Sequence, residues 1–186
     1  MVVETRNAPP KQIIDGDALL PYQLPQPREM QPELVHAGVL TDWLADDELW
    51  VPVASGAHMK PLLLHASAGY YVNLLRVRRT GVLSRHRHTG PVHALTLRGK
   101  WHYLEHDWVA EEGSYAWEPP GETHTITVPE GVTEMITWFH VSGGYTYVDP
   151  YGAVLGYEDV FTKIATCRAY YEQIGLGADY VDRFVK

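Results

Sequence analysis

The feature that most restricts the fold of this chain is a series of short apolar segments between Leu49 and about Val148, separated by glycine, proline and aspartate. The clearest members are residues 70–77 and 133–140, which are rich in the β-branched and aromatic residues that favour strands. Many short strands separated by turn signals are typical of an antiparallel barrel or jelly roll. We therefore expect an all-β fold.

The two ends of the chain differ from this central region. Six prolines interrupt residues 1–35, and they favour an irregular arm that packs across the barrel or a neighbouring subunit. Residues 42–46 predict a short helical turn. From about residue 158 to 173 the spacing becomes helical, and a second short helix is expected over 178–184. The predicted apolar stripe of the first helix consists of Phe161, Ile164, Ala165, Arg168 and Tyr171.

We therefore expect an arm (1–35), a barrel (36–156) and a helical tail (157–186) that together form one domain. The 186 residues are a single-domain length, and 45% hydrophobic residues suffice for a sizeable core. The tail is expected to act as a lid or an interface.

Charge and cysteine usage exclude several function classes. A net charge of -8 argues against nucleic-acid binding, and the basic stretch 76–79 predicts a strand with one solvated face. No apolar run approaches the roughly 20 residues of a membrane span, and the first residues show no signal-peptide pattern. The single cysteine, Cys167, can form no internal disulfide. We expect a cytoplasmic protein without a membrane partner.

Three histidines have the spacing of metal ligands. His86 and His88 lie two residues apart, so on an extended strand their side chains point to the same face. His124, expected on another strand, would complete a site of three imidazoles. Neutral imidazoles suit zinc, copper, iron or nickel. A closed structural zinc site would need a fourth protein ligand that is not evident here, so we expect an open site.

The residues around His124 resemble the second conserved motif of the cupin superfamily. Gly113, Pro119, Gly121 and His124 match that motif position for position. The resemblance implies a single-domain cupin, a double-stranded β-helix or jelly-roll barrel.

The first cupin motif is present with two departures: four rather than five residues precede His86, and no glutamate follows His88. Counting back from Gly99 places Val92 at the glutamate position, whereas counting forward from His88 places His93 there. A shift of one residue reverses the face of a strand. We favour the first count, because residues 94–98 continue without a bulge signal. Val92 would then line the pocket of a three-histidine site, and His93 as a fourth ligand is the alternative.

A longer resemblance covers residues 86–108 and 117–124, which are similar to the 2,4′-dihydroxyacetophenone dioxygenases. It extends over most of the chain, including the arm. It implies a non-haem iron(II) enzyme whose ligands are His86, His88 and His124. Such an enzyme uses dioxygen to cleave the bond between the carbonyl and hydroxymethyl carbons of an aryl hydroxyketone, giving 4-hydroxybenzoate and formate.

This reaction needs a base and a pocket for a phenol ring. Glu118 stands where cupin strands more often carry an apolar residue, so we expect it to be the base or, equally, a carboxylate that holds a histidine nitrogen. Trp101 and Tyr103 share one strand face and predict the ring pocket, with Tyr103 able to hydrogen-bond a substrate oxygen. Weaker pocket candidates are Trp138, Trp117 and His140.

The remaining polar candidates are expected at the surface or in structural roles. They are Glu122 and five histidines: His36, His58, His65, His102 and His106.

Two other functions remain open. A three-histidine iron enzyme that cleaves β-diketones such as acetylacetone would need almost the same metal chemistry. A cupin that binds zinc as a sensor or regulatory module, like the metal-binding domain of certain anti-sigma factors, would not be an enzyme. By analogy with other cupins, we expect a homodimer or homotetramer.

Overall fold

The computed structural model describes residues 21–45 and 47–186, and the chain divides into two compact units, Met1–Pro32 and Glu33–Lys186. In the first unit, residues 21–32 form neither helix nor strand. Residues 1–20 of the predicted arm, and Asp46 of the predicted helical turn, lie outside the described residues.

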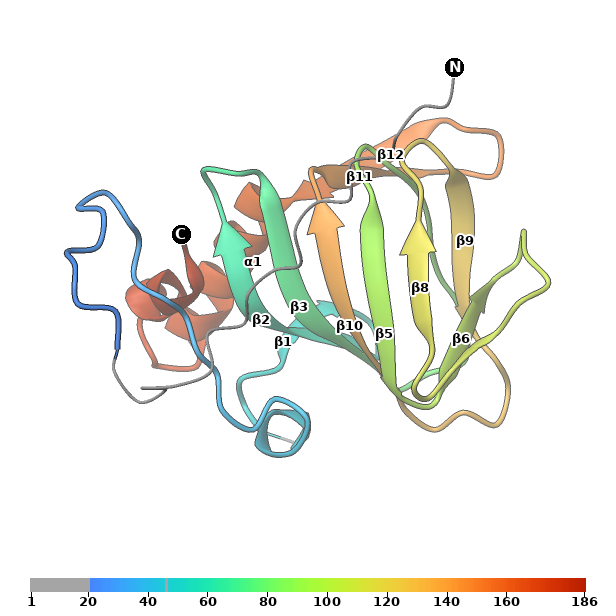
Figure 1. The fold of residues 1–186 in the computed structure, drawn as a ribbon. Coiled ribbons are helices and arrows are strands. Elements are labelled where there is room, and N and C mark those ends of the chain that lie inside the picture. Colours follow the sequence, from blue (N-terminus) through green and yellow to red (C-terminus); the bar gives the residue numbers. More distant parts are fainter. Residues whose placement is uncertain (1–20, 46) are drawn as a thin grey trace, which may run out of the picture. The chain divides into compact units, whose positions relative to one another are not determined.

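Two six-stranded sheets form the second unit (Figure 1). One has the order β1-β2-β3-β10-β5-β8 and the other β12-β11-β4-β9-β6-β7, and all the strand pairs are antiparallel. The strands are β1 Val51–Ala54, β2 Ala57–His65, β3 Tyr70–Val77, β4 Gly81–His88, β5 Val92–Arg98, β6 Lys100–Tyr103, β7 Ala110–Glu111, β8 Tyr115–Glu118, β9 Thr123–Val128, β10 Met135–Ser142, β11 Gly144–Val148 and β12 Val154–Asp159. The expected all-β fold is confirmed. The strand predicted at 70–77 has those bounds, and the one predicted at 133–140 begins two residues later.

The main core contains the inward-facing side chains of both sheets, among them Trp101, Tyr103 and Phe139. A second, smaller cluster packs Trp50 against Leu62, Leu74 and Ile136. The short 3₁₀ helix η1 (Asp42–Leu44) confirms the predicted helical turn, and its Trp43 and Leu44 pack against this second cluster.

Arg76 corrects the prediction of a solvated basic strand at 76–79. Its side chain is buried, and the guanidinium lies 4.2 Å from the centre of the Trp50 ring. Arginine stacks well on an aromatic face because its charge is spread over a plane. The stretch therefore contributes to packing as well as to the surface.

Two helices follow the last strand: α1 (Val160–Gln173) and the 3₁₀ helix η2 (Ala178–Phe184). Asp159 caps α1, accepting a hydrogen bond from the Thr162 backbone in a capping box. In the part of the chain that the structure describes, no helix is long and apolar enough to cross a membrane.

The predicted stripe of α1 is correct for Tyr171, which is buried, and for Ile164, which packs against the core, but it is wrong for its other three residues. Phe161 is 60% exposed, and the buried residues are Val160, Lys163, Cys167 and Tyr171. The buried face includes a lysine because Lys163 forms an ion pair with Glu158 at the end of β12. A hydrophobicity pattern assigns lysine to solvent, so it cannot anticipate such a pair.

Candidate metal centre

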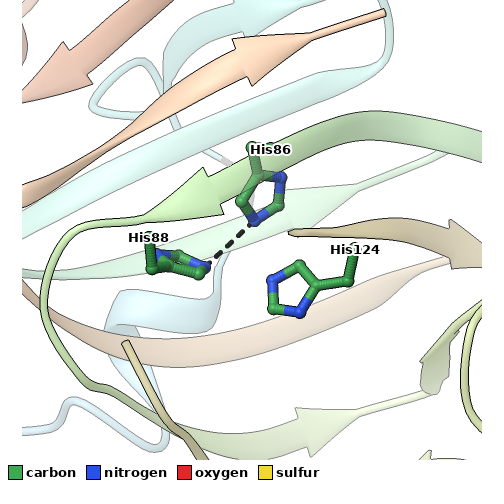
Figure 2. A group of neighbouring side chains, drawn as sticks. All are labelled: His86, His88 and His124. Atoms are coloured by element: carbon green, nitrogen blue, oxygen red, sulfur yellow. Dashed lines mark hydrogen bonds between the residues drawn. The ribbon is translucent and has the colours of Figure 1, made fainter. Parts of the chain in front are cut away.

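The three predicted ligands lie together inside the second unit (Figure 2). Strand β4 supplies His86 and His88, which project to one face because they are two residues apart. Strand β9 pairs with β4 so that His124 lies directly opposite His86. The three ring centres are 4.7 to 5.1 Å apart, and each ring offers a nitrogen within 4.8 Å of the others.

Three nitrogen atoms of this cluster, Nδ1 of His88 and both ring nitrogens of His124, have no hydrogen-bond partner among the described residues. Nε2 of His86 faces Nε2 of His88 at 3.1 Å. The exposed fractions of the three residues are 6%, 3% and 0%. Leaving one such group unpaired costs about 1–3 kcal/mol. A cation bound between the rings would satisfy these lone pairs, so the residues fit a transition metal.

The protonation states suit a metal ligand as well. Burial, followed by the nearby charges of His88 and His124, holds the pKa of His86 well below its usual range. Burial chiefly lowers the pKa of His124 to about 4, although the Glu118 carboxylate acts in the opposite direction. Both imidazoles are therefore neutral at pH 7, which is the form that binds metal.

Ser84 orients one ligand. Its hydroxyl lies 3.0 Å from Nδ1 of His86. When this hydroxyl oxygen accepts a hydrogen bond from Nδ1–H, the lone pair of His86 is on Nε2, which faces the other two rings.

Glu118 brings a carboxylate to the three histidines from β8, the edge strand of the other sheet. It is 3% exposed at the end of β8, and its Oε2 lies 3.2 Å from Nε2 of His88 and 3.6 Å from Nε2 of His124. Neither carboxylate oxygen has a hydrogen bond of normal geometry among the described residues. Its position beside the ligand nitrogens suits both roles considered for it, base and histidine partner.

Val92 and His93 point to opposite sides of β5. Val92 is buried and lines the cavity beside the histidines. His93 places its Nδ1 2.7 Å from the Tyr115 hydroxyl, and its ring lies near His140 on the outer side of the sheet. The structure thus places Val92 at the glutamate position and keeps His93 away from the metal centre.

Of the predicted pocket aromatics, Tyr103 lies in the site. Its ring stacks on His124 with a centre distance of 3.6 Å and an angle of 9°. Burial, and then the Glu118 carboxylate, raise the pKa of Tyr103 well above its usual value, so its hydroxyl stays protonated. Trp101 is fully buried behind Tyr103, where its Nε1 donates to Thr96 Oγ1 at 3.0 Å, and it does not line the cavity.

Trp138 lies on the other face of its strand. It packs against the second hydrophobic cluster, while its neighbours Phe139 and Val141 line the cavity. Side chains alternate along a strand, so Trp138 and Phe139 cannot share a face. Placing Trp138 in the pocket was therefore wrong, and His140 lies on the outer side with it.

Glu122 is less solvated than predicted. Its carboxylate pairs with Nε2 of His106 at 2.8 Å and lies 3.9 Å from Nδ1 of His124. The pair therefore lies beside His124, a candidate metal ligand.

A cavity of about 620 Å³ opens beside the histidines. His86, His88 and Tyr103 line one part of it, and its walls are largely apolar. This volume is in the range of pockets that bind small organic molecules. Among the lining residues that the sequence did not predict are Tyr145, Tyr147, Glu158 and Lys163. The spacing of the two tyrosines repeats that of His86 and His88, but only the pairing of β11 with β4 places them beside the histidines.

Two antiparallel sheets that enclose three histidines on adjoining strands define a cupin. The profile of the ChrR cupin-like domain matches residues 43–145, and the chain belongs to this family.

Solved structures share the fold. An RmlC-like cupin protein from Ralstonia eutropha is 29% identical over 67% of this chain and 82% of its own, with a TM-score of 0.64. An acetylacetone dioxygenase from Acinetobacter johnsonii is 16% identical over 80% of this chain and 99% of its own, with a TM-score of 0.65. At 16% identity this likeness concerns the fold alone. A search of curated proteins found no match.

Proposed function

We propose that this protein is a non-haem iron(II) dioxygenase that cleaves an aryl α-hydroxyketone, with 2,4′-dihydroxyacetophenone as substrate. One molecule of ketone and one of dioxygen give 4-hydroxybenzoate and formate, which accounts for every atom. The observation that carries the proposal is the open set of three buried histidines beside both a carboxylate and a largely apolar cavity. The similarity of residues 86–108 and 117–124 to the 2,4′-dihydroxyacetophenone dioxygenases supports the choice of substrate.

Iron held by His86, His88 and His124 would supply a positive charge for the carbonyl and hydroxyl oxygens of the hydroxyketone. It would also supply electrons for dioxygen activation. The hydroxymethyl group must lose a proton before its bond to the carbonyl carbon breaks. Glu118 is the carboxylate that faces the ligand nitrogens, so we assign it this proton. Because Glu118 is 3% exposed, bulk water does not compete with the substrate for it.

The other residues of the site bind and orient the ketone. Tyr103 keeps its proton and lines the cavity, so it can donate a hydrogen bond to a substrate oxygen. Val92, Phe139 and Val141 form an apolar wall against which an aromatic ring would pack.

A second candidate, cleavage of a β-diketone, is favoured by one observation. The acetylacetone dioxygenase from Acinetobacter johnsonii matches this chain over 99% of its own length. The same histidines and the same carboxylate would serve that reaction, and only the occupant of the cavity would differ.

Oxygen uptake by protein loaded anaerobically with ferrous iron tests the proposal. The two substrates, 2,4′-dihydroxyacetophenone and acetylacetone, are tested in parallel with zinc-loaded protein as control and chromatographic detection of the two acids. We expect one dioxygen consumed per hydroxyketone, with loss in His124→Ala and retention in His102→Ala, a histidine outside the cluster. Uptake with acetylacetone alone would favour the second candidate. No uptake with full iron occupancy would overturn both and leave a zinc-binding role.

A further inference from the structure

A polar network that the proposed reaction does not use forms another part of the cavity wall. It consists of Tyr145 and Tyr147 on β11, Glu158 on β12 and Lys163 on α1, and all four residues line the cavity. Both tyrosine hydroxyls donate to Oε2 of Glu158, at 2.8 Å from Tyr145 and 2.5 Å from Tyr147. Lys163 pairs with the other carboxylate oxygen, Oε1.

Strand pairing places this network beside the metal centre. In the pairing of β11 with β4, Tyr145 lies opposite His88 and Tyr147 opposite His86. The ring of Tyr145 lies 4.8 Å from that of His86, and Glu158 is the partner of Tyr145 on β12. In Figure 1, β11 and β12 run next to each other. A ligand held at the histidines and filling the cavity therefore meets the two tyrosines.

The charge on Glu158 sets the direction of the hydrogen bonds. Burial would raise its pKa, but the Lys163 ammonium and the two tyrosine hydroxyls outweigh burial and lower the pKa below its usual value. The ionised carboxylate can only accept hydrogen bonds. Tyr145 and Tyr147 must then both donate, and the Lys163 charge is neutralised within the network.

These constraints leave Tyr147 with one function toward a ligand. Its proton is committed to Glu158 at 2.5 Å, since the Tyr145 oxygen is more distant, at 3.5 Å. Its oxygen therefore offers only lone pairs to the cavity. Donation to a carboxylate also increases the electron density on that oxygen, which makes it a stronger acceptor. A methoxy or keto oxygen of a ligand in the same place has no proton to donate. Two acceptor oxygens would then face each other without a hydrogen bond.

We propose that Tyr147 Oη accepts a hydrogen bond from a hydroxyl group on the ligand, and that the cavity thereby selects aromatic ketones whose ring carries a phenolic hydroxyl. Tyr147 is the specificity-determining residue. Glu158 and Lys163 are positioning residues that act through it. This inference rests on the proposed function only for the identity of the reacting end, the ketone bound at the histidines.

Binding of unreactive analogues to zinc-loaded protein tests the inference without turnover. The probes are 4-hydroxyacetophenone, which donates a hydrogen bond, and 4-methoxyacetophenone, which cannot, and both are titrated by calorimetry. The wild type should bind the hydroxy compound about tenfold more tightly or better, the value of one buried hydrogen bond. Tyr147→Phe should abolish that preference and bind the methoxy compound at least as well as the wild type does. Tyr157→Phe, the same change at a 67% exposed tyrosine of β12, should keep the preference.

A thermal melt of each variant establishes that it is folded. Equal binding of the two analogues by wild type, or an unchanged preference in Tyr147→Phe, would overturn the inference. Weaker binding of both analogues by the same factor in Tyr147→Phe would also overturn it, because that is a packing effect. Oxygen uptake by iron-loaded protein with 2,4′-dihydroxyacetophenone, which has both the reacting end and the ring hydroxyl, tests the proposed function separately. A preference that depends on Tyr147 without such uptake supports the inference and contradicts the proposed function.

Discussion

Glu118 lies directly opposite Val92 in the pairing of β8 with β5. Val92 occupies the position where the cupin pattern has a glutamate, and the carboxylate reaches His88 from the adjoining strand instead, at 3.2 Å. The two positions face the same centre, because directly opposed residues of an antiparallel pair project to the same side. The site therefore retains a carboxylate although the familiar position is apolar.

Glu118→Gln tests the assignment of the base. The amide keeps the size of the side chain but cannot take a proton, so we expect turnover to fall about 10²–10⁴-fold while iron content is unchanged. Oxygen uptake and metal analysis measure the two quantities. Glu112→Gln, at an exposed position, is the matched control. A loss of iron in proportion to activity would show that Glu118 supports a ligand histidine rather than moving protons.

The metal-free protein should lose stability as the pH falls from about 6.5 to about 4. In this range His124 is neutral when folded, with a pKa of about 4, but binds a proton when unfolded, so the free energy of unfolding rises with pH. The lowered pKa corresponds to about 3 kcal/mol across that range. Urea denaturation of the metal-free protein at several pH values measures the slope, which should be smaller in His124→Gln. An identical slope in that variant would contradict the prediction.

Lys163→Met should destabilise the protein by about 3–5 kcal/mol, because it leaves the Glu158 carboxylate, which is only 16% exposed, without its cation. Adding Glu158→Gln to this variant removes the uncompensated charge, so we expect the double variant to recover much of the lost stability. Chemical denaturation of the four proteins of the cycle measures the coupling between the two residues. If the two substitutions change the free energy of unfolding additively, the ion pair makes no joint contribution to stability.

Gly99→Ala should destabilise the barrel more than Gly131→Ala. Both glycines have positive φ angles, 68° and 81°, so both substitutions add backbone strain of about 1 kcal/mol. A Cβ at residue 99 would also lie 2.3 Å from the backbone oxygen of Glu134, whereas residue 131 has open space. Thermal unfolding compares the two variants. Equal melting temperatures would mean that the chain relaxes around residue 99 without cost.

The sequence by itself determined the all-β fold, the strand at 70–77 and the shared strand face of His86 and His88. The physical reason is that these features depend on local periodicity and spacing, as in His86 and His88, whose separation of two residues puts them on one strand face. The count from Gly99 likewise identified Val92 as the residue that faces inward. The cupin motif indicated His124 as the third candidate ligand, but only the pairing of β9 with β4 brings it opposite His86.

Only the tertiary structure decided which strands are neighbours, and with them the rest of the cavity. Tyr147 lines the cavity because β11 pairs with β4. Lys163 lines it because its ion pair with Glu158 holds the lysine side of α1 against the barrel. The prediction that Trp138 lines the pocket was wrong for the same kind of reason. The second hydrophobic cluster packs on the outer side of β10, and Trp138 faces that side. These contacts join residues that are far apart in the chain. Their free energies come from burial and charge pairing that exist only once the sheets have assembled.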